Sequence, residues 1–270
     1  MRVPFVKMHG LGNDFIVLDA HGGALPNMTR SLVVALADRF TGIGCDQLIV
    51  LEPSDRADLT MRIFNHDGGE VEACGNATRA VGLLLGKPAR IETLGGLLTV
   101  DPAAGGVSVD LPAPRLEWDA IPLAYAMDTF NLPVAWEQLD NPSAVNVGNP
   151  HVVFFVADCN GVELDRLGPE IEHDPLFPER INVNVATVES RQRIRLRVWE
   201  RGVGETRACG TGACATAVAA IRRGLVDREV TVALPGGELR IGWDGQGPIR
   251  MTGPAAESFR GEFDVADYLA

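Results

Sequence analysis

Positive charge is scarce in this sequence of 270 residues. Lysine occurs only at Lys7 and Lys87, and the formal net charge is −12. No run of Lys and Arg is present, whereas binding to nucleic-acid phosphates requires clustered positive charge. We therefore expect no nucleic-acid partner and look instead to a small-molecule substrate.

Long apolar runs are also absent. None reaches the ~18 residues that a membrane-spanning helix needs. The N-terminus leads into a strand-like segment and lacks the pattern of a signal peptide. We expect a cytoplasmic protein without a membrane role. Apolar residues still make up 46% of the chain, which is enough for a folded core.

Cysteine is too sparse and too scattered for the common cysteine-rich sites. There are five cysteines, an odd number, with no CxxC spacing, and the five histidines form no HExxH motif. This argues against a disulfide framework and against a metal site. No GxGxxG or P-loop pattern follows a strand and opens a helix, so nucleotide cofactors are not expected either. We predict no metal and no cofactor.

The most informative feature that is present is an internal duplication. The segments MRIFNHDGGEVEACGN (61–76) and LRVWERGVGETRACGT (196–211) align without a gap at an offset of 135 residues, and six of their sixteen positions are identical, Ala73/Ala208 among them. One matched pair is Cys74 and Cys209. Weaker echoes extend the repeat, such as Gly12-Asn13 with Gly148-Asn149.

Each copy is expected to be mostly β with one good helix. Short β-rich runs occur at 15–19, 47–51, 58–64 and 97–100, and again at 152–156, 182–188, 194–199 and 239–241. Helices are predicted at 77–85 and 211–221, where Ala, Leu and Val dominate without proline, and Gly86 and Gly224 end them. The fold class is therefore α+β: two similar, pseudo-symmetric domains, each a mostly antiparallel curled sheet around a central helix.

A Pro-rich stretch near 111–122 is the expected linker between the copies. We divide the chain into an N-terminal half, 1–115, and a C-terminal half, 116–257. In this division the tail, 258–270, is allowed to return to the first half. A homodimer is compatible with the sequence.

Both matched cysteines stand directly before a predicted helix. The first N–H groups of a helix lack internal partners, and its dipole places partial positive charge there. A thiolate is stabilised at such a position, where cysteine pKa values fall from ~8.5 to roughly 3.5–7.5, and a carboxylate can bind to the same N–H groups. Asn76 and Thr211 are expected to add capping side chains.

Pseudo-two-fold packing of the copies would place Cys74 and Cys209 on opposite faces of one carbon. One thiolate could then remove a proton while the other thiol delivers one, which inverts a stereocentre. A lone cysteine before a helix is usually only a small buried residue, but two in matched positions favour function. Cys45, Cys159 and Cys214 lack this setting and are expected to be structural.

With these residues the chain resembles the diaminopimelate epimerase family over nearly its full length. The matching segments are 8–15, 42–47, 62–65 with 67–68, 74–76, 148–151, 177–182, and 200–202 through 209–212. Three positions depart from the family pattern, namely Cys45, His66 and Ala77. The resemblance implies a cofactor-independent isomerase that interconverts LL- and meso-2,6-diaminopimelate, a step toward lysine and, in many bacteria, peptidoglycan, with the active site between two similar domains.

The resemblance also implies roles for individual residues. Cys74 and Cys209 would be the acid/base pair, and His151 and Glu200 would keep the thiols in working protonation states. The substrate ligands would be Asn13, Gln47, Asn65, Gly75, Asn76, Asn149, Asn182, Glu200, Arg201, Gly210 and Thr211.

Part of this follows from the residues themselves. The copies differ where a distal group must be recognised, because Asn65 aligns with Glu200 and His66 aligns with Arg201, and Arg201 can bind a carboxylate through two hydrogen bonds. Asn149 and Asn182 could instead be ordinary turn residues, and His151 could be a core histidine.

Three rival functions stay open at this stage. A proline racemase-like enzyme would use the same two-cysteine chemistry on another substrate. A redox protein would cycle the cysteines through a disulfide, although such cysteines usually lie close in sequence. A duplicated binding protein would perform no chemistry at all.

Overall fold

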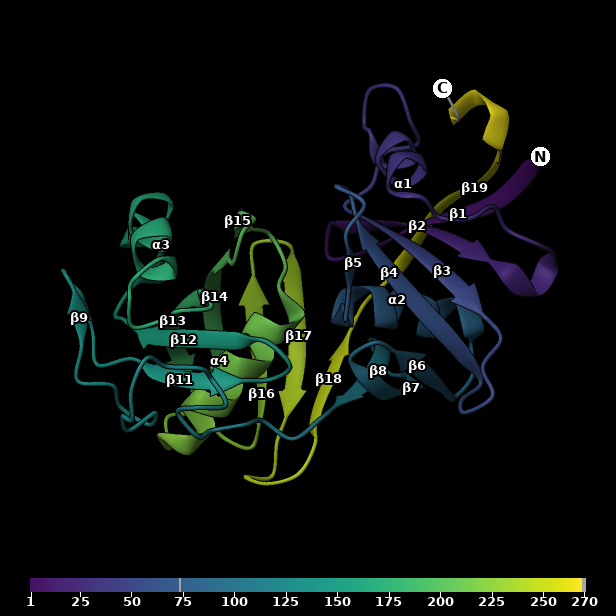
Figure 1. Ribbon diagram of the computed structural model, residues 1–270. Helices are drawn as coiled ribbons and strands as arrows, with labels where there is room; N and C mark the ends of the chain where they lie inside the picture. The colour runs from purple at the N-terminus through teal and green to yellow at the C-terminus, as the bar shows by residue number, and fades with distance from the viewer. Residues whose placement is uncertain (73, 269–270) are drawn as a thin grey trace. The chain divides into compact units, whose positions relative to one another are not determined.

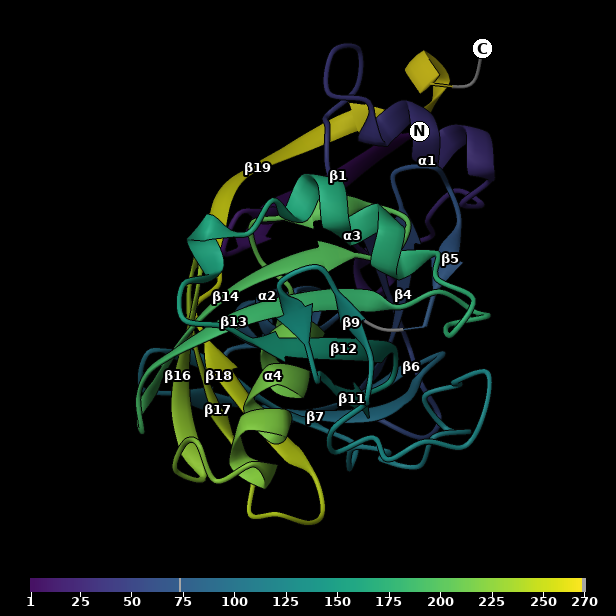
Figure 2. The same cartoon turned by 90° about the vertical axis from the view of Figure 1, so that its left-hand side faces the viewer.

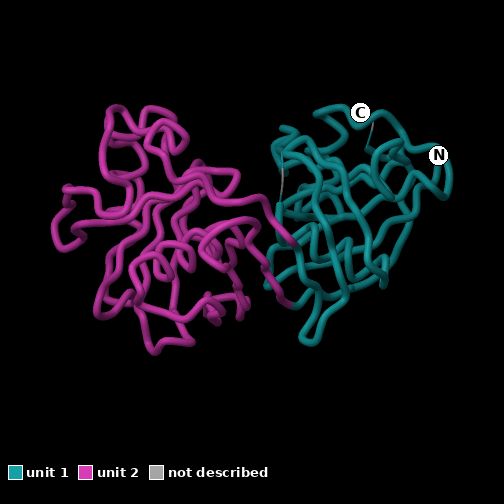
Figure 3. The backbone as a smooth tube through the Cα atoms, turned by 90° about the horizontal axis from the view of Figure 1, so that it is seen from below, with its two compact units in different colours: residues 1–109, 254–270 teal, residues 110–253 magenta. Residues whose placement is uncertain are grey.

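The computed structural model describes residues 1–72 and 74–268. It divides into two compact units, shown in different colours in Figure 3. Unit 1 consists of residues 1–109 and 254–270, and unit 2 consists of residues 110–253. The boundaries expected from the sequence, at 115 and 257, lie a few residues beyond these limits. The tail from 258 belongs to unit 1, with residues 269 and 270 outside the described part.

Unit 1 is a curled sheet with two α-helices (Figure 1). Its elements are β1 (Arg2–Gly10), β2 (Asn13–Asp19), η1 (Ala20–Gly22), α1 (Arg30–Ala37), β3 (Gln47–Glu52), β4 (Leu59–Asn65), β5 (Glu70–Val71), α2 (Gly75–Leu85), β6 (Ala89–Thr93), β7 (Gly96–Ala103), β19 (Ala256–Asp264) and η3 (Val265–Tyr268). Strand β8 (Gly106–Leu111) runs from unit 1 into unit 2.

Unit 2 has the same type of architecture. Its elements are β9 (Ala135–Trp136), β10 (Leu139–Asp140), β11 (Ser143–Asn146), β12 (Pro150–Phe155), η2 (Cys159–Gly161), α3 (Leu164–Glu172), β13 (Asn182–Ser190), β14 (Arg193–Glu200), β15 (Gly204–Thr206), α4 (Gly210–Arg222), β16 (Glu229–Leu234), β17 (Gly237–Gly242) and β18 (Ile249–Gly253).

Strand pairing repeats between the units, residue for residue. Strands β2 and β3 are parallel with Phe15 opposite Gln47, and β12 and β13 are parallel with His151 opposite Asn182. The antiparallel pairs β3–β4 and β13–β14, and the parallel pairs β4–β6 and β14–β16, match in the same way. The duplication seen in the sequence is therefore a duplication of sheet register, and the two-domain α+β class is confirmed.

Helices α2 and α4 are the two helices expected after the cysteines. Helix α4 buries ten of its residues and contacts strands from β11 to β18, so the curled sheet surrounds it. Helix α2 contacts β1, β7 and β19. A Cβ on Gly82 would lie 2.7 Å from the Val107 side chain, so α2 approaches its sheet closely because this residue is glycine.

Each half also contains a second helix that the sequence did not predict, α1 in unit 1 and α3 in unit 2. Helix α1 has only eight residues, and Thr29 caps it by accepting a hydrogen bond from the Leu32 N–H group. Helix α3 contains Gly168 and Pro169, which normally mark loops. It packs on β13 and β14 (Figure 2), and a Cβ on Gly168 would overlap the Trp199 ring at 2.5 Å. Tertiary packing thus overrides a weak helical sequence.

Each unit has its own apolar core. In unit 1 it includes Ile16, Leu32, Leu48 and Phe64. In unit 2 it includes residues from 121 to 185 that span β11–β13 and α3. Within the described residues, no helix is long and apolar enough to cross a membrane.

Candidate active-site residues

Cys74 is the N-cap residue of α2 and lies half-buried. Its Sγ atom donates to the Asn13 Oδ1 atom at 3.7 Å. Asn13 opens β2 directly after Gly12, whose φ of 93° favours glycine. The matching turn in unit 2 uses Gly148, with φ 112°, before Asn149. Both copies therefore use a glycine turn to place an amide at the start of a strand.

Gln47 and Asn65 form an amide pair on neighbouring strands of unit 1. They are opposite each other in the β3–β4 register, and the Gln47 Nε2 group donates to Asn65 Oδ1 at 2.9 Å. The Gln47 Oε1 atom is buried and has no hydrogen-bond partner within the described chain. A buried acceptor without a donor is costly, so this oxygen is suited to receive a ligand N–H group.

Asn76 is the second residue of α2, and the N-cap position belongs to Cys74. Its Nδ2 group donates to Asn13 Oδ1 at 3.1 Å, and its Oδ1 atom accepts from Arg79 Nη2 at 2.8 Å. Arg79 is fully buried on the same helix. The Asn76 amide is therefore part of a side-chain network.

Cys209 occupies the matching N-cap of α4, and its sulfur both accepts from the helix backbone and forms a hydrogen bond with Glu200. The Gly212 N–H group donates to Cys209 Sγ at 3.3 Å, and Thr211 Oγ1 lies 3.5 Å from the sulfur. Burial, and next the negative charge of Glu200, raise the pKa of Cys209 well above its ordinary value. The hydrogen bond from the Gly212 N–H group lowers the pKa of Cys209, but its effect is smaller than those of burial and Glu200.

Glu200 ends β14 and is the acidic neighbour of Cys209. The Thr206 hydroxyl donates to its Oε1 atom at 2.5 Å. The turn after Glu200 is held by buried Glu172, which accepts from the Gly202 N–H group at 2.9 Å and from Trp199 Nε1 at 2.8 Å. The carboxylate whose charge adds to the raised pKa of Cys209 is thus firmly positioned.

His151 is fully buried on β12, and burial lowers its pKa from 6.5 to about 3. Its Nδ1 atom lies 3.3 Å from Asn184 Oδ1. The Asn184 amide is fixed by its Nδ2 group, which donates to the Gly212 carbonyl at 3.3 Å. His151 must therefore donate from Nδ1 and carry its lone pair on Nε2. Nε2 is 2.9 Å from the Asn149 side chain, which then faces it with its NH₂ group.

Asn182 and Arg201 meet at the start of β13. Asn182 is buried; its Nδ2 group donates to the Pro150 carbonyl at 2.8 Å, and its Oδ1 atom accepts from the Arg201 N–H group at 3.0 Å. Its amide thus ties the strand ends of unit 2 together. The Arg201 side chain is exposed and uses one N–H group on the Glu179 carbonyl at 3.0 Å. A guanidinium has five N–H groups, so others remain for a carboxylate.

Two identities in the repeat are explained by matched ion pairs. Arg62 binds Glu70 through two hydrogen bonds of 2.8 and 3.0 Å. Arg197 binds Glu205 in the same way at 2.7 and 2.9 Å. Each pair joins the two strands that precede a cysteine, so these residues shape the approach to α2 and α4. Ala73, another matched position, lies outside the described residues.

The remaining cysteines are buried, as expected for structural residues. Burial raises the pKa of Cys45 to about 12. In the part of the chain that the structure describes, no group of three His, Cys, Asp or Glu side chains could hold a metal ion.

The sequence did not reveal several polar residues that support these clusters, namely Asp14, Asp46, Arg79, Glu172 and Asn184. The partners cited above lie 3 to 33 residues away in the chain. Two sequence signals could have indicated such residues. Arg79 interrupts the apolar run 77–85, and Asn184 occupies an inward position of the strand 182–188.

Comparison with known proteins shows the family to which the chain is related. The family model described as diaminopimelate epimerase matches residues 5–114 and 143–257. Diaminopimelate epimerase of Erythrobacter litoralis is 67% identical, over 99% of this chain and 100% of that protein. The enzyme of Rhizorhabdus wittichii is 66% identical, over 100% of this chain and 98% of that protein.

Solved structures with the same fold are more distant in sequence. A Bacillus anthracis phenazine biosynthesis protein of the PhzF family has a TM-score of 0.70 at 16% identity, covering 97% of this chain and 99% of its own. A hydroxyproline epimerase from Agrobacterium vitis has a TM-score of 0.69 at 16% identity, covering 97% and 92%. These two show the fold alone, whereas the sequence matches establish that the chain belongs to the diaminopimelate epimerase family.

Proposed function

We propose that this protein interconverts LL- and meso-2,6-diaminopimelate without metal or organic cofactor, using Cys74 and Cys209 as its acid and base. The observation that carries the proposal is the matched position of the two thiols. Each is the N-cap of a helix in one copy of a duplicated fold. A duplicated pair of acid–base groups suits a reaction that must exchange a proton on two faces of one carbon.

The helix N-termini provide electrostatic stabilisation for this reaction. The backbone N–H groups of Gly75 and Asn76, and of Gly210 and Thr211, lie in the first turns of α2 and α4. Such groups bind a carboxylate and stabilise negative charge that builds on it when the α-proton is removed. Metal or pyridoxal chemistry is not needed for this part of the mechanism.

The two thiols have different hydrogen-bond partners, so we expect them to differ in how readily they gain and lose a proton. Cys209 has a raised pKa, but Glu200 is adjacent and can accept its proton. Cys74 faces the amide oxygen of Asn13. His151 is neutral and acts through the orientation of Asn149 rather than through charge.

The substrate ligands that we propose are polar groups with unused capacity. The buried Gln47 Oε1 atom can accept from an ammonium group. Arg201 is exposed and can bind the distal carboxylate. Asn65, Asn149 and Asn182 complete the set, with Asn182 acting mainly by holding the Arg201 backbone.

Proton NMR in D₂O tests the function directly. LL-diaminopimelate incubated with the protein should lose its α-proton signal as meso product forms. Cys159→Ala is a matched control, because Cys159 is a buried cysteine outside the proposed site, and it should exchange the proton as wild type does. Retention of the α-proton with the intact protein would contradict the proposal.

A proline racemase-like activity is the principal rival, since the hydroxyproline epimerase shares the fold. A panel of proline, hydroxyproline and diaminopimelate separates the two, and we expect turnover of diaminopimelate only. A cytoplasmic location and a homodimer are further proposals, tested by cell fractionation and by light scattering of the purified protein.

A further inference from the structure

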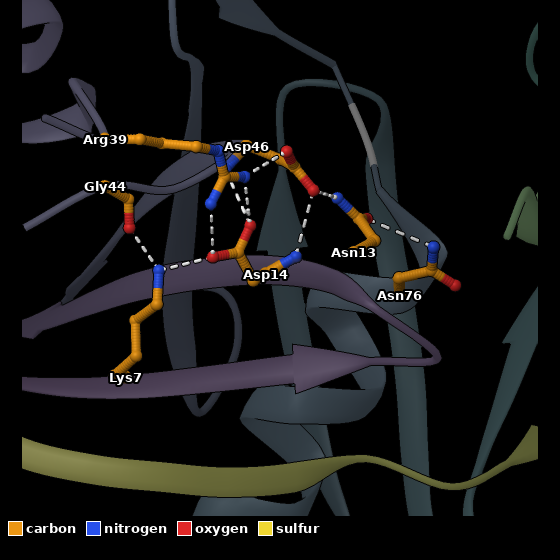
Figure 4. A network of polar contacts seen from close by, with 7 residues as sticks. All are labelled: Lys7, Asn13, Asp14, Arg39, Gly44, Asp46 and Asn76. Atoms are coloured by element: carbon orange, nitrogen blue, oxygen red, sulfur yellow. Dashed lines mark hydrogen bonds and ion pairs between the residues drawn. The ribbon is translucent and has the colours of Figure 1, made fainter. Parts of the chain in front are cut away.

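A directed chain of hydrogen bonds runs through four side chains of unit 1, from a cation to an anion. Arg79 Nη2 donates to Asn76 Oδ1 at 2.8 Å, and Asn76 Nδ2 donates to Asn13 Oδ1 at 3.1 Å. Asn13 Nδ2 donates to Asp46 Oδ2 at 3.0 Å. Figure 4 shows the part from Asn76 to Asp46.

The two ends of the chain determine how both amides are oriented. An arginine can only donate, so Asn76 must turn its oxygen toward Arg79 and its NH₂ group toward Asn13. An ionised aspartate can only accept, so Asn13 must turn its NH₂ group toward Asp46. Both constraints place the Asn13 oxygen in the middle of the chain. Its orientation therefore follows from chemistry and not from the assignment of O and N atoms.

That oxygen is the atom that faces Cys74. The distance from Cys74 Sγ to Asn13 Oδ1 is 3.7 Å. A carbonyl oxygen accepts a hydrogen bond from a thiol but repels a thiolate, so it favours the protonated sulfur. An amide turned by 180° would present N–H to the sulfur and favour the thiolate instead.

We propose that Asp46 and Arg79 are positioning residues for Cys74, which fix the Asn13 and Asn76 amides so that an oxygen faces the sulfur and the substrate-free protein keeps Cys74 as a thiol. Only the use of that thiol as a proton donor to substrate rests on the proposed function. The protonation state itself does not depend on it.

Asp46 is well held for this role. Arg39 Nη2 contacts Asp46 Oδ1 at 2.6 Å, and the Asp14 N–H group donates to Asp46 Oδ2 at 3.1 Å. Asp14 is in turn bound by Arg39 and Lys7 (Figure 4). The charged groups that reach this network are thus Lys7 from β1, Asp14 from β2, Arg39 and Asp46 from the segment between α1 and β3, and Arg79 from α2. Networks of this kind strengthen their bonds mutually.

The second copy lacks the residues for such a chain of hydrogen bonds at the matching positions. Asn13, Asn76 and Arg79 correspond to Asn149, Thr211 and Cys214, so neither the cation nor the second amide is present. Cys209 instead accepts an N–H group from Gly212. The two thiols of the duplication therefore have different partners: Cys74 donates to the Asn13 amide oxygen, whereas Cys209 accepts from the Gly212 N–H group and forms a hydrogen bond with Glu200.

The test is the pH dependence of Cys74 alkylation by iodoacetamide in the substrate-free protein. Tryptic peptide 63–79 contains Cys74 as its only cysteine, so mass spectrometry measures it separately. In Asp46→Ala, the midpoint of reaction should fall by about one pH unit, since one hydrogen bond corresponds to roughly that shift. In Asp46→Asn, the midpoint should stay near the wild-type value, because an amide oxygen can still accept from Asn13.

The Asn variant separates positioning from charge. Equal shifts in both variants would mean that the charge of Asp46 acts directly, and no shift in either would mean that the chain does not matter; each result overturns the proposal. Asn13→Ala removes the oxygen itself and should lower the midpoint similarly. If Asp46→Ala does not give the wild-type circular dichroism spectrum, the Asn13→Ala variant tests the proposal in its place. An unchanged midpoint of Cys74 alkylation in Asn13→Ala would refute the proposal. Since no substrate is present, these results are independent of whether the D₂O experiment succeeds.

Discussion

Lowering the pH from 7 to 5 should destabilise unit 2 through His151. The folded chain holds this residue neutral, with a pKa of about 3 in place of 6.5. Above pH 6.5 the His151 side chain is neutral in both the folded and the unfolded chain, so protonation does not lower the free energy of unfolding. Below pH 6.5 the unfolded chain binds a proton that the folded chain cannot, so stability is lost as the pH falls toward 3. At pH 5 the loss is about 2 kcal/mol.

Tryptophan fluorescence is a selective assay for this effect. All four tryptophans lie between residues 110 and 253, which is unit 2. Urea titrations at pH 7, 6 and 5 therefore report the unfolding of the unit that contains His151. With a urea m-value of 1–3 kcal/mol/M, a loss of about 2 kcal/mol lowers the midpoint by roughly 1 M.

His151→Gln is the control, because glutamine does not take up a proton in this range. This variant should be less stable at pH 7 but should lose less stability between pH 7 and 5 than wild type does. Wild-type and variant midpoints that fall in parallel would refute the reasoning, since the pH dependence would then come from other groups.

Three further outcomes are expected. Replacing Cys74 or Cys209 by Ala should each reduce α-proton exchange by ~10²–10⁴-fold while leaving the circular dichroism spectrum intact; near-full activity of either would exclude a two-thiol mechanism. Arg201→Ala should raise the KM for diaminopimelate strongly, with little effect on an analogue that lacks the distal carboxylate; an equal effect on both would indicate a structural arginine. Burial raises the pKa of Cys45 to about 12, whereas the thiol of the unfolded chain ionises at pH ~8.5. The free energy of unfolding should therefore fall as the pH rises above ~8.5, by about 1–2 kcal/mol at pH 10. Cys45→Ala should abolish this loss, which thermal melts at pH 7 and pH 10 measure. A Cys45→Ala variant that loses as much stability between these pH values as wild type does would contradict the prediction.

The sequence predicted those features of the fold that depend on local pattern and on repetition. Helices α2 and α4 begin within two residues of their predicted starts, because an apolar run and a terminal glycine are local signals. The repeat also predicted that Asn65 and Glu200 are equivalent, and both end the corresponding strands β4 and β14.

Features that depend on distant partners could not be predicted. Asp46 is bonded to Asn13 and Asp14, which are more than thirty residues earlier, and nothing near Asp46 in the chain indicates them. Asn76 looked like a helix cap because local preference favours that role. Its side chain instead bonds to Asn13, which lies 63 residues earlier, and to Arg79 on the same helix.

Strand β19 pairs with β1 along most of its length, from Asp264 opposite Arg2 to Ala256 opposite His9. Unit 1 is therefore discontinuous, and unit 2 is an insertion within it. During synthesis the ribosome completes residues 110–253 before it supplies the edge strand that β1 requires. Unit 2 can fold as a continuous segment, whereas β1 must wait with one edge unpaired. A released chain that ends at residue 253 should therefore protect unit 2 from protease while leaving β1 open to cleavage.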